Sequence, residues 1–389
     1  MESVRIEKMI PGGQAIGTLP DGKKIMLWNA LPGELVTEWK ITKNKSSYIE
    51  GIAEVISNPS DKRIVSKDSC YLATSPWQIM DYTYELQQKQ EVLREILRQQ
   101  KIPDDHFEIQ EVRTDGRDFF YRNKMEYALY YAIEKAQIFP AMRGRGTHRK
   151  LPLSQSSLEM PSIWQKATEI IDDLNVRHEE ARKYQSLLLR SNQAGEVSGG
   201  LLENRKPHPK FDKLKDTILG QEYSYSPNGF FQINLPVYET VLIEIRKWIK
   251  TDKVLDLYSG VGTIGLSVAR DRDLTLVECD KSAFLEMENN CRGANATPIL
   301  AKSEEALDYI EPDQTVIVDP PRAGCLPNVV EELHNKKPTM IIYLSCNPIT
   351  QARDVSALLD AYKIKTCIPF NFFPRTPHLE NLMILERKN

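Results

Sequence analysis

Cys346 stands in the string Ser345-Cys346-Asn347-Pro348, after a buried apolar run and before a predicted helix. Asn347 is a typical N-cap and Pro348 a typical first helical residue, so the thiol lies at a helix N-terminus. The free N–H groups and the helix dipole favour a thiolate there, so we expect a lowered pKa and a nucleophile. An inert buried cysteine is the alternative reading. Cys325 is a rival nucleophile, although its loop lacks a strand-to-helix turn.

A candidate acid–base residue follows near the end of the chain. His378 and Glu380 are two residues apart, so both side chains can face one side of an extended segment. A carboxylate beside a thiolate is unfavourable unless it accepts a proton, which makes Glu380 a candidate base. His378 is more simply explained as a surface or capping histidine. Because no His/Cys cluster has the spacing of metal ligands, we predict no metal ion.

A glycine-rich turn follows the predicted strand 254–258. It matches G-x-G-x-x-G, begins with Gly260 and Gly262, and enters a predicted helix. Glycines let a ligand approach the backbone, and Glu278, at the end of the next predicted strand, is placed to accept ribose hydrogen bonds. Asp256 suits a ligand ammonium group and would repel a pyrophosphate, which favours S-adenosylmethionine over a nicotinamide cofactor. A tight turn without a ligand is the alternative.

The string Asp319-Pro320-Pro321-Arg322 follows a further predicted strand, 315–319. Its prolines hold an extended loop that presents the Asp319 side chain. Arg322 stands where methylases of exocyclic amines carry an aromatic residue, and its guanidinium suits a phosphate or a base carbonyl. A rigid connecting loop explains the string equally well.

Three regions must position these residues. In residues 223–389 strands alternate with helices, which predicts an α/β fold with a doubly wound, mostly parallel sheet. Residues 1–57 consist of short β-rich runs broken by turns, which predicts a small β-barrel. Residues 58–222 read as an α+β region, and an apolar stripe within it predicts a helix over 82–100 that we expect to dock on the C-terminal domain.

Composition excludes several classes of protein. The 51 Lys and Arg and 54 Asp and Glu give a net charge of −3, which alone does not indicate nucleic-acid binding. However, basic residues cluster from Arg143 and Arg145 to Lys150 and again from Arg205 to Lys215, and local clusters decide phosphate binding. No apolar run approaches a membrane span and no signal peptide is visible. The six cysteines show no paired spacing, which indicates a reducing cytoplasm.

Five ordered motifs resemble the S-adenosylmethionine-dependent RNA 5-methyluridine methyltransferase family. They occupy residues 226–234, 256–262, 319–324, 345–354 and 373–380. Residues 121–124 resemble the motif of that family's central domain, and residues 1–57 resemble its RNA-binding barrel, the TRAM domain. The resemblance covers nearly the whole chain and is weakest over residues 140–220.

The resemblance implies a class I methyltransferase that methylates C5 of a uridine in RNA. It implies that Cys346 adds to C6 of uracil and that Glu380 then removes the C5 proton. The positions that match cofactor contacts are Gln232, Tyr258, Glu278 and Asp319. We expect RNA contacts at Phe230, Arg122, Lys124, Arg143, Arg145 and Arg322. The N-terminal barrel favours large-subunit ribosomal RNA over transfer RNA, and we expect a cytoplasmic monomer.

The chain departs from many bacterial members of this family at one place. Those members carry a four-cysteine iron–sulfur cluster between the barrel and the first helix, whereas Cys70 is the only cysteine before residue 279 here. One thiolate cannot hold a cluster, so we predict none. Two alternatives to the leading function are a cytosine-5 RNA methyltransferase and a non-catalytic RNA-binding protein that retains the fold.

Overall fold

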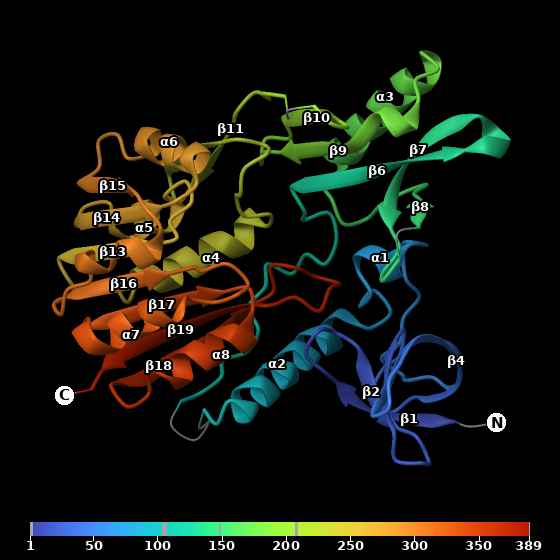
Figure 1. Ribbon diagram of the computed structural model, residues 1–389, viewed down its shortest axis with the longest axis horizontal. Coiled ribbons are helices and arrows are strands. Elements are labelled where there is room, and N and C mark those ends of the chain that lie inside the picture. The colour runs from blue at the N-terminus through green and yellow to red at the C-terminus, as the bar shows by residue number, and fades with distance from the viewer. Residues whose placement is uncertain (1–2, 103–106, 148, 207–208, 389) are drawn as a thin grey trace.

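The computed structural model describes residues 3–102, 107–147, 149–206 and 209–388. Figure 1 shows a blue barrel, a green central sheet and a yellow-to-red α/β layer, with helix α2 running from the barrel along the α/β layer. Among the helices within these ranges, none is both long enough and apolar enough to cross a membrane.

The N-terminal strands form the predicted barrel, which confirms that part of the fold. The sheet closes in the order β1-β2-β3-β5-β4. Alternate residues such as Val4, Ile6, Ile25 and Leu27 point inward and are fully buried, as a half-buried strand pattern requires. The strands are β1 (Val4–Met9), β2 (Ala15–Thr18), β3 (Lys24–Trp28), β4 (Leu35–Asn44) and β5 (Tyr48–Asn58).

A short helix α1 (Tyr71–Thr74) and the long helix α2 (Tyr82–Gln99) follow the barrel. The side chain of Asp81 caps α2 by accepting hydrogen bonds from the backbone N–H groups of Thr83 and Tyr84. The apolar face of α2 packs into the α/β layer beside α8 (Pro348–Ser356), as expected from its stripe. Helix α2 therefore joins the barrel to the C-terminal domain.

Gln78 closes the segment between the barrel and helix α2. Its amide oxygen accepts from the backbone N–H groups of Lys67 and Asp68, and its amide nitrogen donates to the carboxylate of Asp68 at 2.7 Å. The same carboxylate accepts from the hydroxyl of Ser157 in the central domain at 2.8 Å. Because Asp68, Gln78 and Ser157 are all buried, this polar network ties the segment to the central domain.

The central domain is an antiparallel sheet in the order β10-β9-β6-β7-β8, covered by α3 (Pro161–Val176). Its strands are β6 (Lys124–Ala132), β7 (Gln137–Arg143), β8 (Lys150–Pro152), β9 (Tyr184–Ser191) and β10 (Val197–Glu203). The hairpin β11 (Leu214–Ile218) and β12 (Gln221–Tyr225) comes next, and its buried residues pack into the core of the C-terminal domain. His148 and residues 207–208, within the two basic stretches, lie outside the described residues.

The C-terminal domain is the predicted α/β sheet, in the order β15-β14-β13-β16-β17-β19-β18. Its first five strands are parallel, and β19 is antiparallel between β17 and β18. The sequence did not predict β15 and α4. The elements are α4 (Leu235–Arg246), β13 (Lys253–Leu257), α5 (Thr263–Ala269), β14 (Asp273–Glu278), α6 (Lys281–Asn290), β15 (Ala296–Leu300), β16 (Gln314–Val318), α7 (Pro327–Lys336), β17 (Met340–Ser345), β18 (Tyr362–Phe370) and β19 (Glu380–Arg387).

Candidate active site

Strand register brings Cys346 and Glu380 together. Ser345, the last residue of β17, pairs with Asn381 of the antiparallel strand β19. The next step of this register sets Cys346 opposite Glu380, although the two residues are far apart in sequence. Asn347 caps helix α8 as predicted, because its side chain accepts from the backbone N–H of Ile349. The thiol therefore lies between a helix N-terminus and a carboxyl group.

A cavity of about 210 Å³ opens at Cys346. It is smaller than the roughly 300–1,000 Å³ pockets that hold drug-sized ligands, and so suits a single ring-sized group. Three parts of the chain line it: the barrel loop at Gly12, helix α2 at Lys89, and the C-terminal domain at Arg322 and His378. His378 was predicted to be a surface or capping residue, but it forms part of this wall, with its ring edge-on to Phe373.

The pKa of Cys346 differs from the sequence prediction. Burial, then the nearby carboxyl groups of Glu380 and Asp319, raise this pKa to about 11, whereas the guanidinium of Arg322 acts in the opposite direction. The helix N-terminus alone therefore does not produce a resting thiolate. The rival Cys325 is buried beneath its loop, and burial raises its pKa to about 12. Cys346, in contrast, is half-buried and borders the cavity.

The carboxyl groups of Asp319 and Glu380 lie near each other at one edge of the sheet. Asp319 follows strand β16, and Glu380 begins strand β19. Burial and the neighbouring Asp319 raise the pKa of Glu380 well above its ordinary value, and burial raises the pKa of Asp319 to about 7. Arg322 partly offsets the shift at Glu380. The backbone of Arg322 is itself fixed at the α8 N-terminus, because its carbonyl accepts from the side chains of Asn347 and Thr350. Arg322 is thus the positive group that faces Cys346 and Glu380.

The glycine turn has the geometry expected of a cofactor cradle. Gly260 and Gly262 have φ values of 58° and 84°, and a side chain added at Gly260 would project into open space. Glu278 accepts a hydrogen bond from the backbone N–H of Gly260 at 2.8 Å. Tyr258 also lies in the left-handed region, with φ of 64°, and its hydroxyl is buried without a partner among the described residues. Open backbone and an unpaired buried hydroxyl fit a ligand at this edge.

The side chain of Asp256 was predicted to face a ligand ammonium group, and the structure places it elsewhere. Its carboxylate is fully buried and accepts a hydrogen bond from the backbone N–H of Gly265, the third glycine of the motif, at 2.9 Å. Burial raises its pKa to about 8. The side chain thus faces the start of α5 and has no exposed surface for a ligand ammonium group, because the short turn packs α5 onto the end of β13.

The loop that carries Phe230 and Gln232 is held by the central domain. Lys124 donates to the carbonyls of Asn228 and Gly229 at 3.2 and 3.0 Å, and Asn123 donates to the carbonyl of Gln232 at 3.0 Å. Burial lowers the pKa of Lys124 to about 8, so this predicted RNA contact instead positions the loop. Phe230 is 71% exposed.

The other predicted RNA contacts separate into two kinds. Arg143 is exposed and so is free to meet a partner. Arg145 stacks its guanidinium 4.1 Å from the ring centre of Trp28 in the barrel and donates to the carbonyl of Leu72 at 2.8 Å. Arg122 donates to the carbonyl of Lys124 at 2.9 Å. Arg145 and Arg122 therefore stabilise contacts within the protein, although Arg145 is exposed like Arg143.

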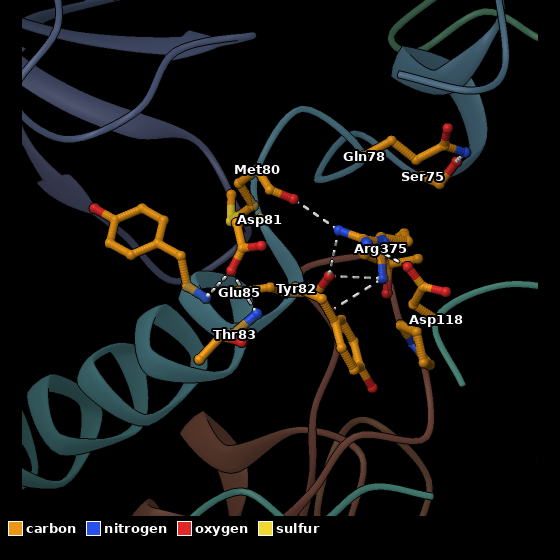
Figure 2. Close-up of polar contacts among 12 residues, drawn as sticks. Ser75, Gln78, Met80, Asp81, Tyr82, Thr83, Glu85, Asp118 and Arg375 are labelled. Atoms are coloured by element: carbon orange, nitrogen blue, oxygen red, sulfur yellow. Dashed lines mark hydrogen bonds and ion pairs between the residues drawn. The ribbon is translucent and has the colours of Figure 1, made fainter. Parts of the chain in front are cut away.

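Sequence reasoning missed a buried ionic network that fixes the loop before Glu380. Figure 2 shows Arg375 among Met80, Glu85 and Asp118. Its backbone N–H donates to Glu85, and its guanidinium donates to the carbonyl of Met80 at 2.7 Å and to the carboxylate of Asp118. Lys89, also buried, pairs with Glu85 at 3.0 Å. The sequence contained one signal for this network. Glu85 and Lys89 precede Leu93 at intervals of four residues, so both lie on the apolar stripe of α2.

Comparison with known proteins supports this reading of the fold. Residues 305–388 match the model of the tRNA (uracil-5-)-methyltransferase family. A protein from Lactobacillus johnsonii that is described as an uncharacterized RNA methyltransferase is 25% identical, with 99% of this chain and 97% of the relative covered. A tRNA (uracil(54)-C(5))-methyltransferase from Pyrococcus horikoshii is 38% identical over 43% of this chain and 40% of the relative.

A solved structure has the same fold along its whole length. The tRNA (uracil-54, C5)-methyltransferase of Pyrococcus abyssi, in complex with S-adenosyl-L-homocysteine, superposes with a TM-score of 0.77. It covers 99% of this chain and 100% of its own, at 24% identity. The chain therefore has the fold of a class I methyltransferase, and the relative that matches it over nearly its full length is described as an RNA methyltransferase. The resemblance to the RNA uracil-5 methyltransferases is confirmed.

Proposed function

We propose that this enzyme transfers a methyl group from S-adenosylmethionine to C5 of a uridine in RNA through a covalent adduct on Cys346. The observation that carries the proposal is the register that sets Cys346 opposite Glu380 at the end of β17. Uracil C5 is a poor nucleophile by itself. A thiol and a nearby carboxyl group supply the two functions that its methylation needs.

The steps follow from these two side chains. The sulfur of Cys346 forms a bond to C6, and the electrons of the C5–C6 double bond move towards the C4 carbonyl. C5 would then take the methyl group, while the methyl–sulfur bond of the donor breaks and its electron pair returns to sulfur, which leaves a neutral thioether. Glu380 accepts the C5 proton, the C5–C6 double bond forms again, and the C6–S bond breaks to return the thiolate. Because Cys346 has a raised pKa in the free protein, we propose that Arg322 stabilises the thiolate that starts the sequence.

S-adenosylmethionine, when bound, supplies a methyl group on a positively charged sulfur. We propose that its contacts are Gln232, Tyr258, Glu278, Asp319, Gly260 and Gly262. Support comes from the open glycine turn, the unpaired Tyr258 hydroxyl and the carboxylate of Asp319 at the same edge of the sheet. Asp256 holds the turn from beneath.

We propose transfer RNA as the substrate, because relatives with named substrates act on uridine 54 of tRNA. The ribosomal RNA expected from the TRAM-like barrel has no comparable support. The extruded uridine would enter the cavity at Cys346, with Phe230 and the exposed Arg143 as RNA contacts. Six unpaired cysteines favour the cytoplasm, and we propose a monomer that needs neither a metal nor an iron–sulfur cluster.

Mass spectrometry of RNA tests this function. Purified enzyme with labelled methyl donor and unmodified tRNA should yield 5-methyluridine, and Cys346→Ala should abolish it. Labelled 5-methylcytidine would favour the cytosine-5 alternative. The absence of any product on both tRNA and ribosomal RNA would favour a non-catalytic RNA-binding protein. RNA containing 5-fluorouridine, which has no removable C5 proton, should trap the wild-type enzyme as a covalent adduct and should not trap Cys346→Ala.

A further inference from the structure

Phe120 has an unusual backbone and an unusual exposure for an aromatic residue. Its φ is 55°, in the left-handed region that bulky side chains rarely adopt. Its side chain is 46% exposed, whereas the aromatic residues on either side, Phe119 and Tyr121, are buried. Strained residues persist where the surrounding structure holds them, and they concentrate at functional sites.

The surrounding contacts account for how Phe120 is held. Its backbone N–H donates to the carbonyl of Ser157 at 2.9 Å. Phe119 is sandwiched between Lys67 Nζ, 3.9 Å from its ring centre, and the guanidinium of Arg375, at 5.1 Å. Tyr121 donates to the carbonyl of Pro374 at 3.0 Å. These contacts fix both neighbours inward, so the backbone turns and presents the Phe120 ring to solvent.

A positive charge accompanies the exposed ring. Lys67 Nζ lies 6.0 Å from the ring centre of Phe120, and the side chain of Lys67 is itself exposed. Across the described ranges, no carboxylate lies within ion-pair distance of this amine. An aromatic face beside an unpaired cation matches a nucleotide, which offers a base to stack and a phosphate to neutralise.

The position of Phe120 relates it to the catalytic loop. Tyr121 contacts Pro374 of that loop, and Arg375 lies against Phe119. Through these neighbours, Phe120 lies next to the loop that leads to Glu380. We infer that Phe120 is a stacking platform for an unpaired base of the substrate RNA, with Lys67 facing the adjoining phosphate. This inference rests on the proposed function only in taking RNA as the partner.

The test compares substitutions that separate the ring from the backbone strain. Phe120→Gly removes the ring and relieves the left-handed strain, so the thermal midpoint should stay the same or rise. The dissociation constant for unmodified in vitro transcribed tRNA should rise about 5- to 150-fold, the range for loss of one stacked base. Phe120→Trp should restore binding, whereas Phe120→Leu should not. Lys67→Gln should weaken binding and reduce its dependence on salt.

Binding is measured by fluorescence anisotropy in a Cys346→Ala background, so the result does not depend on methyl transfer. Tryptophan emission of Phe120→Trp should be quenched by tRNA and should not be quenched by a fully paired RNA duplex. Unchanged affinity in Phe120→Gly, or equal affinity of Phe120→Leu and the wild type, would overturn the stacking role. A failure of the proposed function would instead appear as missing 5-methyluridine in the wild type, whatever the behaviour of Phe120.

Discussion

Glu85 accepts hydrogen bonds from the backbone N–H of Arg375 through both carboxylate oxygens, each at 3.0 Å. A helix in the first quarter of the chain thereby fixes the loop that leads to Glu380. Lys89 extends the contact, because its amine donates to the side chain of Asn371 at 2.6 Å and to the carbonyl of Phe373 at 3.1 Å. The loop geometry at the catalytic carboxyl group thus depends on α2.

Removing the Glu85 charge should destabilise the protein and slow the reaction. Glu85→Gln removes the negative charge that pairs with the buried cations Lys89 and Arg375. Breaking a buried ion pair in this way lowers the free energy of unfolding by about 3–5 kcal/mol. Chemical denaturation measures the free energy of unfolding, and kcat should fall because the loop loses its anchor. Arg94→Gln, a charge change on the exposed face of the same helix, is the control and should leave both unchanged. Equal behaviour of the two variants would refute the anchoring role.

Two glycines of the barrel allow a matched test of the contact between the barrel and the catalytic loop. Gly13 and Gly22 both have positive φ, at 97° and 87°. A Cβ at Gly13 would collide with the side chain of Pro377, whereas a Cβ at Gly22 would have nothing within 4 Å. Alanine at either position has similar backbone strain, so any effect of strain on kcat should be the same in both variants. We therefore expect a lower kcat in Gly13→Ala than in the control Gly22→Ala, because only its side chain displaces the catalytic loop. Equal kcat values for both variants would show that the contact does not matter.

Thiol reactivity should report the raised pKa of Cys346. Because the thiolate is the reactive form, its rate of alkylation should increase nearly tenfold per pH unit and level off only near pH 11. The measurement uses iodoacetamide and a background in which exposed Cys279 and half-buried Cys70 are replaced by Ser. Arg322→Gln should move the midpoint upward, since the guanidinium favours the thiolate. A rate that levels off below pH 8 would contradict this electrostatic picture.

Asp256 should make stability depend on pH. Its pKa is about 8 in the folded protein and near 3.8 when unfolded, so folding favours the protonated form. Below pH 4 both states are protonated and the group has no effect, and stability is then lost as the pH rises towards 8. Asp256→Asn keeps an acceptor for Gly265, so its advantage over the wild type should grow over this interval by at least about 1 kcal/mol. Chemical denaturation at pH 4.5 and at pH 8 measures the free energy of unfolding of both proteins. An equal difference between Asp256→Asn and the wild type at the two pH values would exclude this origin of the pH dependence.

Gln78 should be essential for the segment that precedes α2. Gln78→Ala removes one of the donors to the carboxylate of Asp68, which keeps Ser157, and leaves the backbone N–H groups of Lys67 and Asp68 without their partner. Each group that stays buried and unpaired should cost about 1–3 kcal/mol. Differential scanning calorimetry should show a lower midpoint. Gln155→Ala, which removes one exposed hydrogen bond to the same segment, is the control and should change little. A midpoint unchanged in Gln78→Ala would mean that the network does not hold the segment.

Local signals in the sequence predicted most of the elements and the chemistry at their ends. Alternating strands and helices specified the α/β sheet, the glycine turn specified a close backbone approach, and the Asn-Pro start of α8 located Cys346, because each of these signals is local. The tertiary structure decided what surrounds them. The insertion of β19 beside β17 sets Glu380 opposite Cys346, and the carboxyl groups gathered there raise the thiol pKa that the helix start alone was predicted to lower. Glu85 and Arg375 meet only because α2 packs against the loop before β19. The burial that shifts the pKa of these groups depends on all the segments that surround them.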